Sequence, residues 1–241
     1  AANFTNELGV DGTVRFLANI MGMWVQQECL REWASLGDVA SGGAGRVDWR
    51  LLDAQTEAAQ PARYLLDMSS PELMAPGGMV ERVRSLWIPG PGASPSSSSW
   101  DEAGAGVGDP RAGCVDPRER VTVLRAITDS LALAYRRAIR RTFELSGTRP
   151  EAIHLVGGGS QNRLLAQETA DATGIPTIAG PVEATAVGNM LISLRAIGAA
   201  SGTLRDLRAI SRASSSLVTY EPRASHARLW DEADALLAAR S

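Results

Sequence analysis

The stretch HLVGGGSQNRLLAQE, residues His154–Glu168, decides the fold. A short apolar run over 153–156 predicts a strand, and the apolar spacing over 163–173 predicts a helix. Between them stand three consecutive glycines, which let a ligand approach the main chain closely and tolerate positive φ. A strand, a glycine turn and a helix form the setting in which backbone N–H groups face an anion or a nucleotide.

The spacing of the glycines leaves two interpretations open, a nucleotide site and a turn that is merely tight. The Rossmann fingerprint fails because Asn162 occupies its third glycine position, and the Walker A pattern fails because no Gly-Lys-Ser/Thr follows. Gln161 and Asn162 favour a nucleotide slightly, since amides at a helix start can hydrogen-bond a base or a ribose. Asparagine also caps helices, however.

Further elements around this turn alternate between helix and strand. Asp116, Pro117 and Glu119 have the pattern of a helix start, and the helix is expected to end near Gly147. After the turn we expect a short strand near 176–179, a helix over 183–197, an edge strand over 218–220 and a closing helix over 223–240. Such alternation predicts an α/β fold with helices packed on a sheet.

The region before residue 117 is less regular. Leu17, Ile20, Met21, Trp24 and Val25 recur at helical spacing, which predicts an amphipathic helix from Thr13 to about Glu32. Residues 35–50 have the composition of a loop, and 51–86 are weakly helical with proline interruptions. Residues 89–116 are rich in glycine, proline and serine, which predicts a flexible surface insertion.

Composition excludes several classes of function. The 241 residues are 44% hydrophobic and 21% charged, as in ordinary globular proteins, and the net charge of -3 gives no reason to expect nucleic acid. We expect no membrane association, because no apolar run approaches the length of a membrane span. Two isolated cysteines, Cys29 and Cys114, are too few for a zinc site or a disulfide framework and favour a cytoplasmic location.

Four motifs carry a family resemblance. NFTNE at 3–7, NIMGMWVQQE at 19–28, HLVGGGSQN at 154–162 and AGPVEATAVGN at 179–189 occur together and in this order. In this combination the chain resembles the C-terminal part of the rhamnulokinases, which are FGGY carbohydrate kinases of the actin-like ATPase superfamily. The resemblance implies the C-terminal half of a ribonuclease H-like, actin-like ATPase sugar kinase, with a helix-flanked sheet and with residues 1–241 as the nucleotide-binding half.

The resemblance also implies an activity, namely transfer of the γ-phosphoryl group of ATP, with Mg²⁺, to the 1-hydroxyl of L-rhamnulose. By position, Asn19 matches a sugar-binding asparagine, whereas Gln27 and Gly158 match ATP-binding residues. We extend the nucleotide site to Gly157, Gly159 and Asn162. If 13–32 is one helix, Asn19 and Gln27 lie roughly 12 Å apart along its axis, so one helix could serve both ligands.

No catalytic residue is assigned within this chain. In the family the aspartate base and the hairpin that grips the phosphates precede NFTNE, and the chain starts with Ala1 and no initiator methionine. We therefore expect an N-terminal catalytic half as its partner, and an isolated chain without kinase activity. Asp11 is expected in a turn and Asp171 on a surface helix, while His154 and His226 have no partners that suggest catalysis.

Two alternatives to a rhamnulokinase stay open on the sequence. The chain could belong to a kinase for another ketose or polyol, such as fuculose, xylulose or glycerol, because these kinases share much of the architecture. It could also be a nucleotide-binding module without kinase activity, since the base and the phosphate grip are not in it.

Overall fold

The computed structural model describes residues 4–35, 49–93 and 117–240. The chain divides into two compact units, one of residues 1–19 and 138–223 and one of residues 20–137 and 224–241. We call the first the sheet unit and the second the helical unit. Helix α4 (Pro117–Ser146) contributes residues to both units.

A three-stranded sheet organises the sheet unit. Its strands are β5 (Ile153–Leu155), β6 (Thr177–Ala179) and β7 (Val218–Tyr220), in the order β5-β6-β7. β5 and β6 are parallel and are linked by α5 (Arg163–Thr173), whereas β7 pairs antiparallel with β6. Helix α5 packs on β6 and β7 and buries one apolar side, including Leu165 and Ala166. The predicted α/β alternation is confirmed from residue 117 onward.

A β-hairpin stands where the sequence predicted a helix. β1 (Phe4–Leu8) pairs antiparallel with β2 (Val14–Ala18) through the short helix η1 (Val10–Gly12). The rings of Phe4 and Phe16 stack across the strands at 4.6 Å between centroids. The prediction of a helix from Thr13 is therefore wrong over the β2 residues, because cross-strand pairing with β1 decides their conformation. Helix α1 (Trp24–Ser35) begins only after Gly22.

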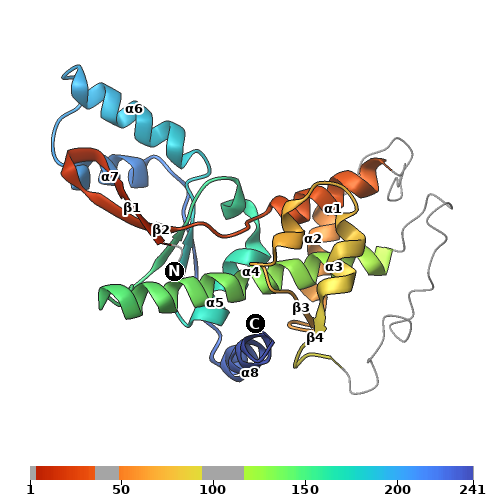
Figure 1. The fold of residues 1–241 in the computed structure, drawn as a ribbon. Helices are drawn as coiled ribbons and strands as arrows, with labels where there is room; N and C mark the ends of the chain where they lie inside the picture. The colour runs from red at the N-terminus through yellow and green to blue at the C-terminus, as the bar shows by residue number, and fades with distance from the viewer. Residues whose placement is uncertain (1–3, 36–48, 94–116, 241) are drawn as a thin grey trace. The chain divides into compact units, whose positions relative to one another are not determined.

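Helices α6 (Ala184–Ala196) and α7 (Leu204–Ala213) complete the sheet unit (Figure 1). The sequence predicted α6 within one residue at each end but did not predict α7. Arg195 of α6 donates two hydrogen bonds to the carboxylate of Asp11 at the hairpin turn, at 2.8 and 2.7 Å. This hydrogen-bonded ion pair holds the pKa of Asp11 below its ordinary value of 3.8. The bidentate pair joins the hairpin to α6.

The helical unit is built around the first two-thirds of α4. It contains the helices α1, α2 (Trp49–Ala58), α3 (Met79–Leu86) and α8 (Ala227–Ala238), with the short helices η2 (Pro71–Met74) and η5 (Ala224–His226). A small sheet pairs β3 (Tyr64–Leu65) antiparallel with β4 (Ile88–Pro89). The weakly helical prediction for 51–86 therefore holds for α2 and α3, and turns, β3 and η2 lie between them. The expected loop at 35–50 and the insertion at 89–116 lie mostly outside the described residues.

Helix α4 ends at Ser146, next to Gly147, as its sequence predicts. Its proposed cap, Asp116, lies outside the described residues. Every residue of α4 from Val123 to Leu133 is buried. Neighbouring segments cover the helix here on more than one side, so its buried positions include the polar residues Arg125, Asp129 and Ser130.

Polar side chains of α4 hold the chain that follows α2. The carboxylate of Asp129 accepts hydrogen bonds from the backbone N–H of Ala62 at 2.7 Å and from Nε of Arg125 at 3.0 Å. Ser130 Oγ accepts one from the N–H of Leu66 at 2.8 Å. Ala62 has a φ of 50°, a left-handed conformation that costs free energy in a residue with a Cβ. Asp129 therefore fixes a strained bend against the helix.

The described cysteine, Cys29, is fully buried in α1 and is not in a disulfide. Burial raises the pKa of its thiol to about 12, so the thiol is uncharged at neutral pH. A neutral buried thiol behaves as a small apolar side chain and is a poor nucleophile. Cys114 lies outside the described residues.

Among the helices in the described parts of the chain, none has both the length and the apolar content to span a bilayer.

Removing the carboxylate of Asp129 should destabilise the helical unit. In the variant Asp129→Ala the guanidinium of Arg125 stays buried without this partner, and the N–H of Ala62 loses its acceptor. We expect the free energy of unfolding to fall by about 3–5 kcal/mol, measured by urea denaturation. Asp53→Ala, at an exposed position of α2, is the control and should change little. Equal stability of wild type and Asp129→Ala would contradict this account.

Removing the charge of Asp11 should loosen the contact between the hairpin and α6. Asparagine tolerates the positive φ of 59° at this position, so Asp11→Asn tests the ion pair and not the turn. Because the folded pKa is lowered, the carboxylate stabilises the protein above the ordinary pKa of 3.8, and this contribution is lost as pH falls through the folded value. Melting temperatures should thus differ between wild type and variant at pH 7 and converge in more acidic buffer. A difference independent of pH would argue against the ion pair.

Candidate functional site

The candidate site is the glycine turn between β5 and α5. Gly157 has a φ of 78° and precedes a short helix, η4 (Gly158–Gln161), that leads directly into α5. Ser160 is buried, and its hydroxyl donates to the carbonyl of Gly157 at 2.7 Å. The N–H of Gly157 donates to the carbonyl of Pro181, in the turn after β6, at 3.1 Å. These bonds fix the main chain of the turn.

Only one of the three glycines is required by backbone conformation. Gly157 has the positive φ that favours glycine, whereas Gly158 and Gly159 do not. A Cβ placed on any of the three would meet no described atom within 4 Å. Packing within the described chain therefore gives no reason for glycine at 158 and 159. The main chain of these two residues is therefore accessible to a ligand or to another polypeptide segment.

Two glycines of the helical unit make the contrast clear. A Cβ at Gly90 would lie 2.2 Å from the carbonyl oxygen of Ala62, and one at Gly92 would lie 2.1 Å from that of Pro61. These glycines are needed for close packing of one chain segment on another. The bare main chain at Gly158 and Gly159 has no such structural use.

Asn162 has a structural task at the same turn. Its side-chain oxygen accepts a hydrogen bond from the N–H of Leu165 at 2.9 Å and so caps the N-terminus of α5. The capping role that the sequence left open for this asparagine is thus present in the structure. The turn brings Gly157, Gly158, Gly159 and Asn162 together, as the continuous motif requires.

The other two predicted site residues lie elsewhere. Asn19 follows β2 in the sheet unit, outside any helix. Gln27 is an exposed residue of α1 in the helical unit. The prediction that one helix carries both amides is therefore wrong, because the chain up to Ala18 is a strand and α1 starts at Trp24. The spacing of about 12 Å along one axis, expected from a shared helix, does not apply.

The carboxylates of α5 are engaged by an arginine. Asp171 was expected on a surface helix, but it is 3% exposed and accepts hydrogen bonds from both the N–H and Nε of Arg223, each at 2.7 Å. Glu168 is also buried and lies 3.3 Å from the same guanidinium. The prediction for Asp171 is wrong because the segment after β7 covers this side of α5. Both carboxylates are therefore paired with a cationic side chain, which does not favour either as a free base.

The structure places both histidines. His154 lies within β5 and is exposed, as its predicted place in a strand requires. His226 is half-buried and ends η5 just before α8, and so lies outside the final helix in which it was expected.

Sequence reasoning missed three arginines of α7. Arg205, Arg208 and Arg212 line a cavity against the sheet, together with His154 of β5 and Val156, which follows this strand. Their spacing of three and four residues is visible in the sequence. Without a predicted helix over 204–213, however, it could not be interpreted as one face.

Comparison with known proteins gives the family. Residues 1–197 match the family described as the FGGY family of carbohydrate kinases, C-terminal domain. The chain is 35% identical over 233 residues to a rhamnulokinase of Bacteroides thetaiotaomicron, covering 97% of this chain and 41% of that protein. It is 32% identical over 221 residues to a rhamnulokinase of Klebsiella pneumoniae, covering 92% of this chain and 38% of the relative.

The fold also has a counterpart among solved structures. A xylulose kinase from Rhodospirillum rubrum superposes with a TM-score of 0.58 and 18% identity, covering 99% of this chain and 41% of that one. At this identity the likeness concerns the fold alone, and it confirms the predicted α/β sugar-kinase fold. The chain spans about two-fifths of the length of the curated relatives it matches. From the family match over residues 1–197, the chain belongs to the FGGY family of carbohydrate kinases.

Proposed function

We propose that this chain is the nucleotide-binding half of an ATP-dependent kinase that converts L-rhamnulose to L-rhamnulose 1-phosphate. The observation that carries the nucleotide part is the open main chain at Gly158 and Gly159, which neither backbone conformation nor packing explains. Similarity to curated rhamnulokinases over 97% and 92% of the chain supports the sugar.

The nucleotide is proposed to lie against the glycine turn. Side chains are absent at 157–159, so a flat purine or a ribose can reach van der Waals distance of the backbone there. The cap of α5 uses the side-chain oxygen of Asn162, which leaves its amide nitrogen as the group to donate to the nucleotide. Gln27 of α1 is proposed as a further nucleotide contact and Asn19 as a contact to the sugar, both from the family resemblance.

The phosphoryl transfer itself needs groups beyond those of this chain. In-line transfer requires a base at the attacking hydroxyl and positive charge around the γ-phosphate, which Mg²⁺ supplies when bound. Arg223 engages Glu168 and Asp171, so these carboxylates of α5 do not fit that role. We assign the base, the phosphate grip and the Mg²⁺ ligands to an N-terminal half.

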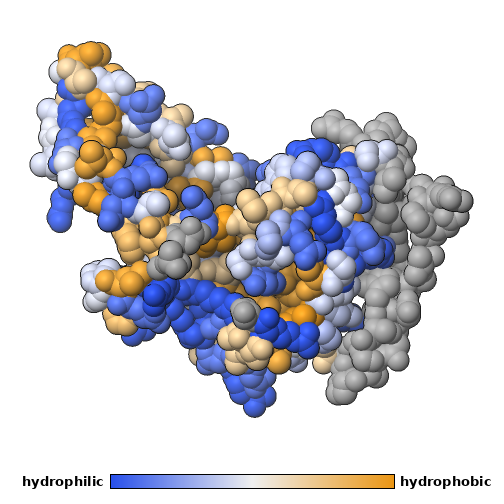
Figure 2. Space-filling model, viewed as in Figure 1, coloured by the Kyte–Doolittle hydropathy of each residue, from blue (hydrophilic) through white to orange (hydrophobic). Residues whose placement is uncertain are grey.

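Exposed apolar side chains of the sheet unit support such a partner half. Leu8 is 84% exposed and Val14 60% in the hairpin, while Met190 is 53% exposed on α6 and Ile197, just after it, 78%. Figure 2 shows apolar residues gathered over the hairpin and α6. Exposed apolar side chains that gather on one surface commonly mark an interaction site. A catalytic half packed on it would remove it from water.

A panel of sugars tests the proposed activity. The full-length kinase should phosphorylate L-rhamnulose at its 1-hydroxyl with ATP and Mg²⁺, while the purified 241-residue chain alone should show no turnover, because we assign the base to the N-terminal half. Release of ADP is measured by a coupled assay on L-rhamnulose, L-fuculose, D-xylulose and glycerol. Preference for another sugar would transfer the assignment to that ketose or polyol, and inactivity on all of them would favour a non-catalytic module. Turnover by the 241-residue chain would show that the base is within it.

A graded series at Gly158 tests the nucleotide site. Its φ is compatible with any residue and its surroundings are open, so Gly158→Ala and Gly158→Val should both fold. We expect the affinity of the full-length enzyme for ADP to fall with side-chain size, by about tenfold or more for valine, because the new methyl groups fill the space the ligand needs. Calorimetric titration gives the affinity, and the melting temperature without ligand is the control for folding. Unchanged affinity in a folded Gly158→Val enzyme would make the turn structural only.

A further inference from the structure

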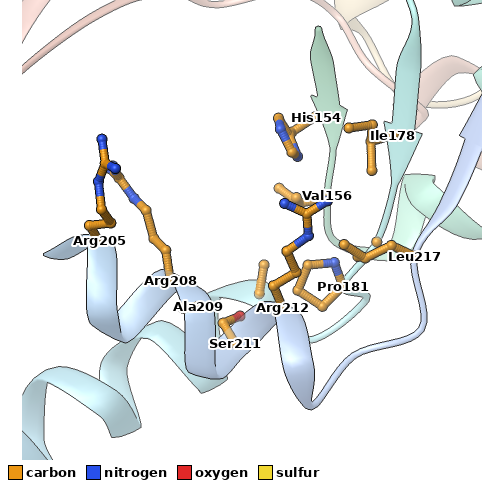
Figure 3. A pocket seen from close by; sticks show the side chains of 12 residues that line it. His154, Val156, Ile178, Pro181, Arg205, Arg208, Ala209, Ser211, Arg212 and Leu217 are labelled. Carbon is orange, nitrogen blue, oxygen red and sulfur yellow. The ribbon is translucent and has the colours of Figure 1, made fainter.

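A cavity lies on the sheet face that carries His154, Val156 and Ile178. It has a volume of about 840 Å³, within the range of roughly 300–1,000 Å³ that is usual for small-molecule sites. Strands β5 and β6 form one wall, the turn at Gly180 and Pro181 forms the floor, and α7 forms the opposite wall (Figure 3). All of these residues belong to the sheet unit.

Helix α7 turns its charged face toward this cavity. Arg205, Arg208 and Arg212 are three and four residues apart, which places them within about 60° of one another around the helix. Ala209 lies on the same face and also lines the cavity. The side chains of Arg205, Arg208 and Arg212 project from this face of α7, opposite the strands with His154 and Ile178 (Figure 3). The apolar side of α7, with Leu207 buried, packs elsewhere.

No carboxylate neutralises these arginines. Among the described residues, the cavity lining contains no Asp or Glu, and none of the three guanidiniums is in an ion pair. The one acidic residue of α7, Asp206, is bound at the helix start, where it accepts hydrogen bonds from the N–H and hydroxyl of Thr203 at 2.7 and 2.8 Å. Like charges three and four residues apart on one helix face destabilise it. A bound anion would remove this repulsion.

Apart from His154 and Ser211, the remaining lining is apolar. Val156, Ile178, Pro181 and Leu217 contribute most of it, so the cavity has a hydrophobic wall facing a row of guanidiniums. Arginine recognises phosphate through paired N–H donors, and an apolar wall suits the body of a small organic molecule. We propose that this cavity is a ligand site for a phosphate monoester of a small organic molecule, separate from the nucleotide proposed at the glycine turn.

The proposal predicts which ligands bind. Phenyl phosphate has a phosphate group for the arginines and an apolar ring for the hydrophobic wall. Inorganic phosphate has only the charged group, and phenol has only the ring. We expect phenyl phosphate to bind the 241-residue chain more tightly than inorganic phosphate and phenol not to bind detectably, as measured by isothermal titration calorimetry at low ionic strength. Equal affinity for phenyl phosphate and inorganic phosphate would contradict the proposed role of the apolar wall in binding. Absence of any phosphate binding would contradict the proposed site as a whole.

Variants distinguish binding inside the cavity from general attraction of phosphate to positive charge on the protein. Arg208→Gln should weaken phenyl phosphate binding by about tenfold, whereas Arg149→Gln, which removes the same charge from an exposed position of the same unit, should not. Ala209→Trp keeps all three arginines but puts a bulky side chain on the cavity wall, and it should abolish binding. Equal effects of Arg208→Gln and Arg149→Gln, or full binding in Ala209→Trp, would refute the proposal.

Binding of phenyl phosphate in the cavity should be independent of the nucleotide site proposed at the glycine turn. Gly158→Val should leave phenyl phosphate binding within about twofold of wild type, while Arg208→Gln should leave ADP binding of the full-length enzyme unchanged. If either variant lost binding of both phenyl phosphate and ADP, the two ligands would share one site, and the proposal of a separate site would be wrong. The melting temperature of each variant shows whether it is folded.

Discussion

The parallel pairing of β5 with β6 is the constraint on which the candidate site depends. It places the carboxyl ends of both strands at the same edge of the sheet, where the glycine turn follows β5 and the Gly180–Pro181 turn follows β6. The two turns hold each other through Gly157 N–H to Pro181 O at 3.1 Å and Gly180 N–H to Leu155 O at 2.9 Å. The carboxyl edge of parallel strands is where α/β proteins commonly bind ligands.

This edge gives the chain two different kinds of surface. At the glycine turn the main chain is bare over residues 157–159, and the side chain of Asn162 is used to cap α5. On the sheet face beside it, α7 presents three arginines across an apolar wall. A bare main chain favours a flat neutral group, while guanidiniums favour phosphate. One strand can therefore serve two ligands through its turn and its face.

The helices and strands that were predicted from sequence are those whose characteristic residues lie within or directly beside the element. α5 and β7 have the predicted bounds, β5 is one residue shorter than predicted, and α4 ends beside its glycine as expected. The β1–β2 hairpin was missed because the apolar residues from Leu17 onward also fit helical spacing, whereas cross-strand contacts such as the stacking of Phe4 on Phe16 decide the conformation of β2. Burial of Asp171 likewise depends on Arg223, which is distant in sequence.

The sequence by itself determined the family, the α/β class and the glycine turn as the place of interest, because all three depend on contiguous motifs. Only the tertiary structure decided that Gly158 and Gly159 have open space beside them, that Asn19 and Gln27 do not share a helix, and that the arginines of α7 face the sheet. Open space and the direction of a helix face depend on which segments meet in three dimensions. No local pattern of residues contains that information.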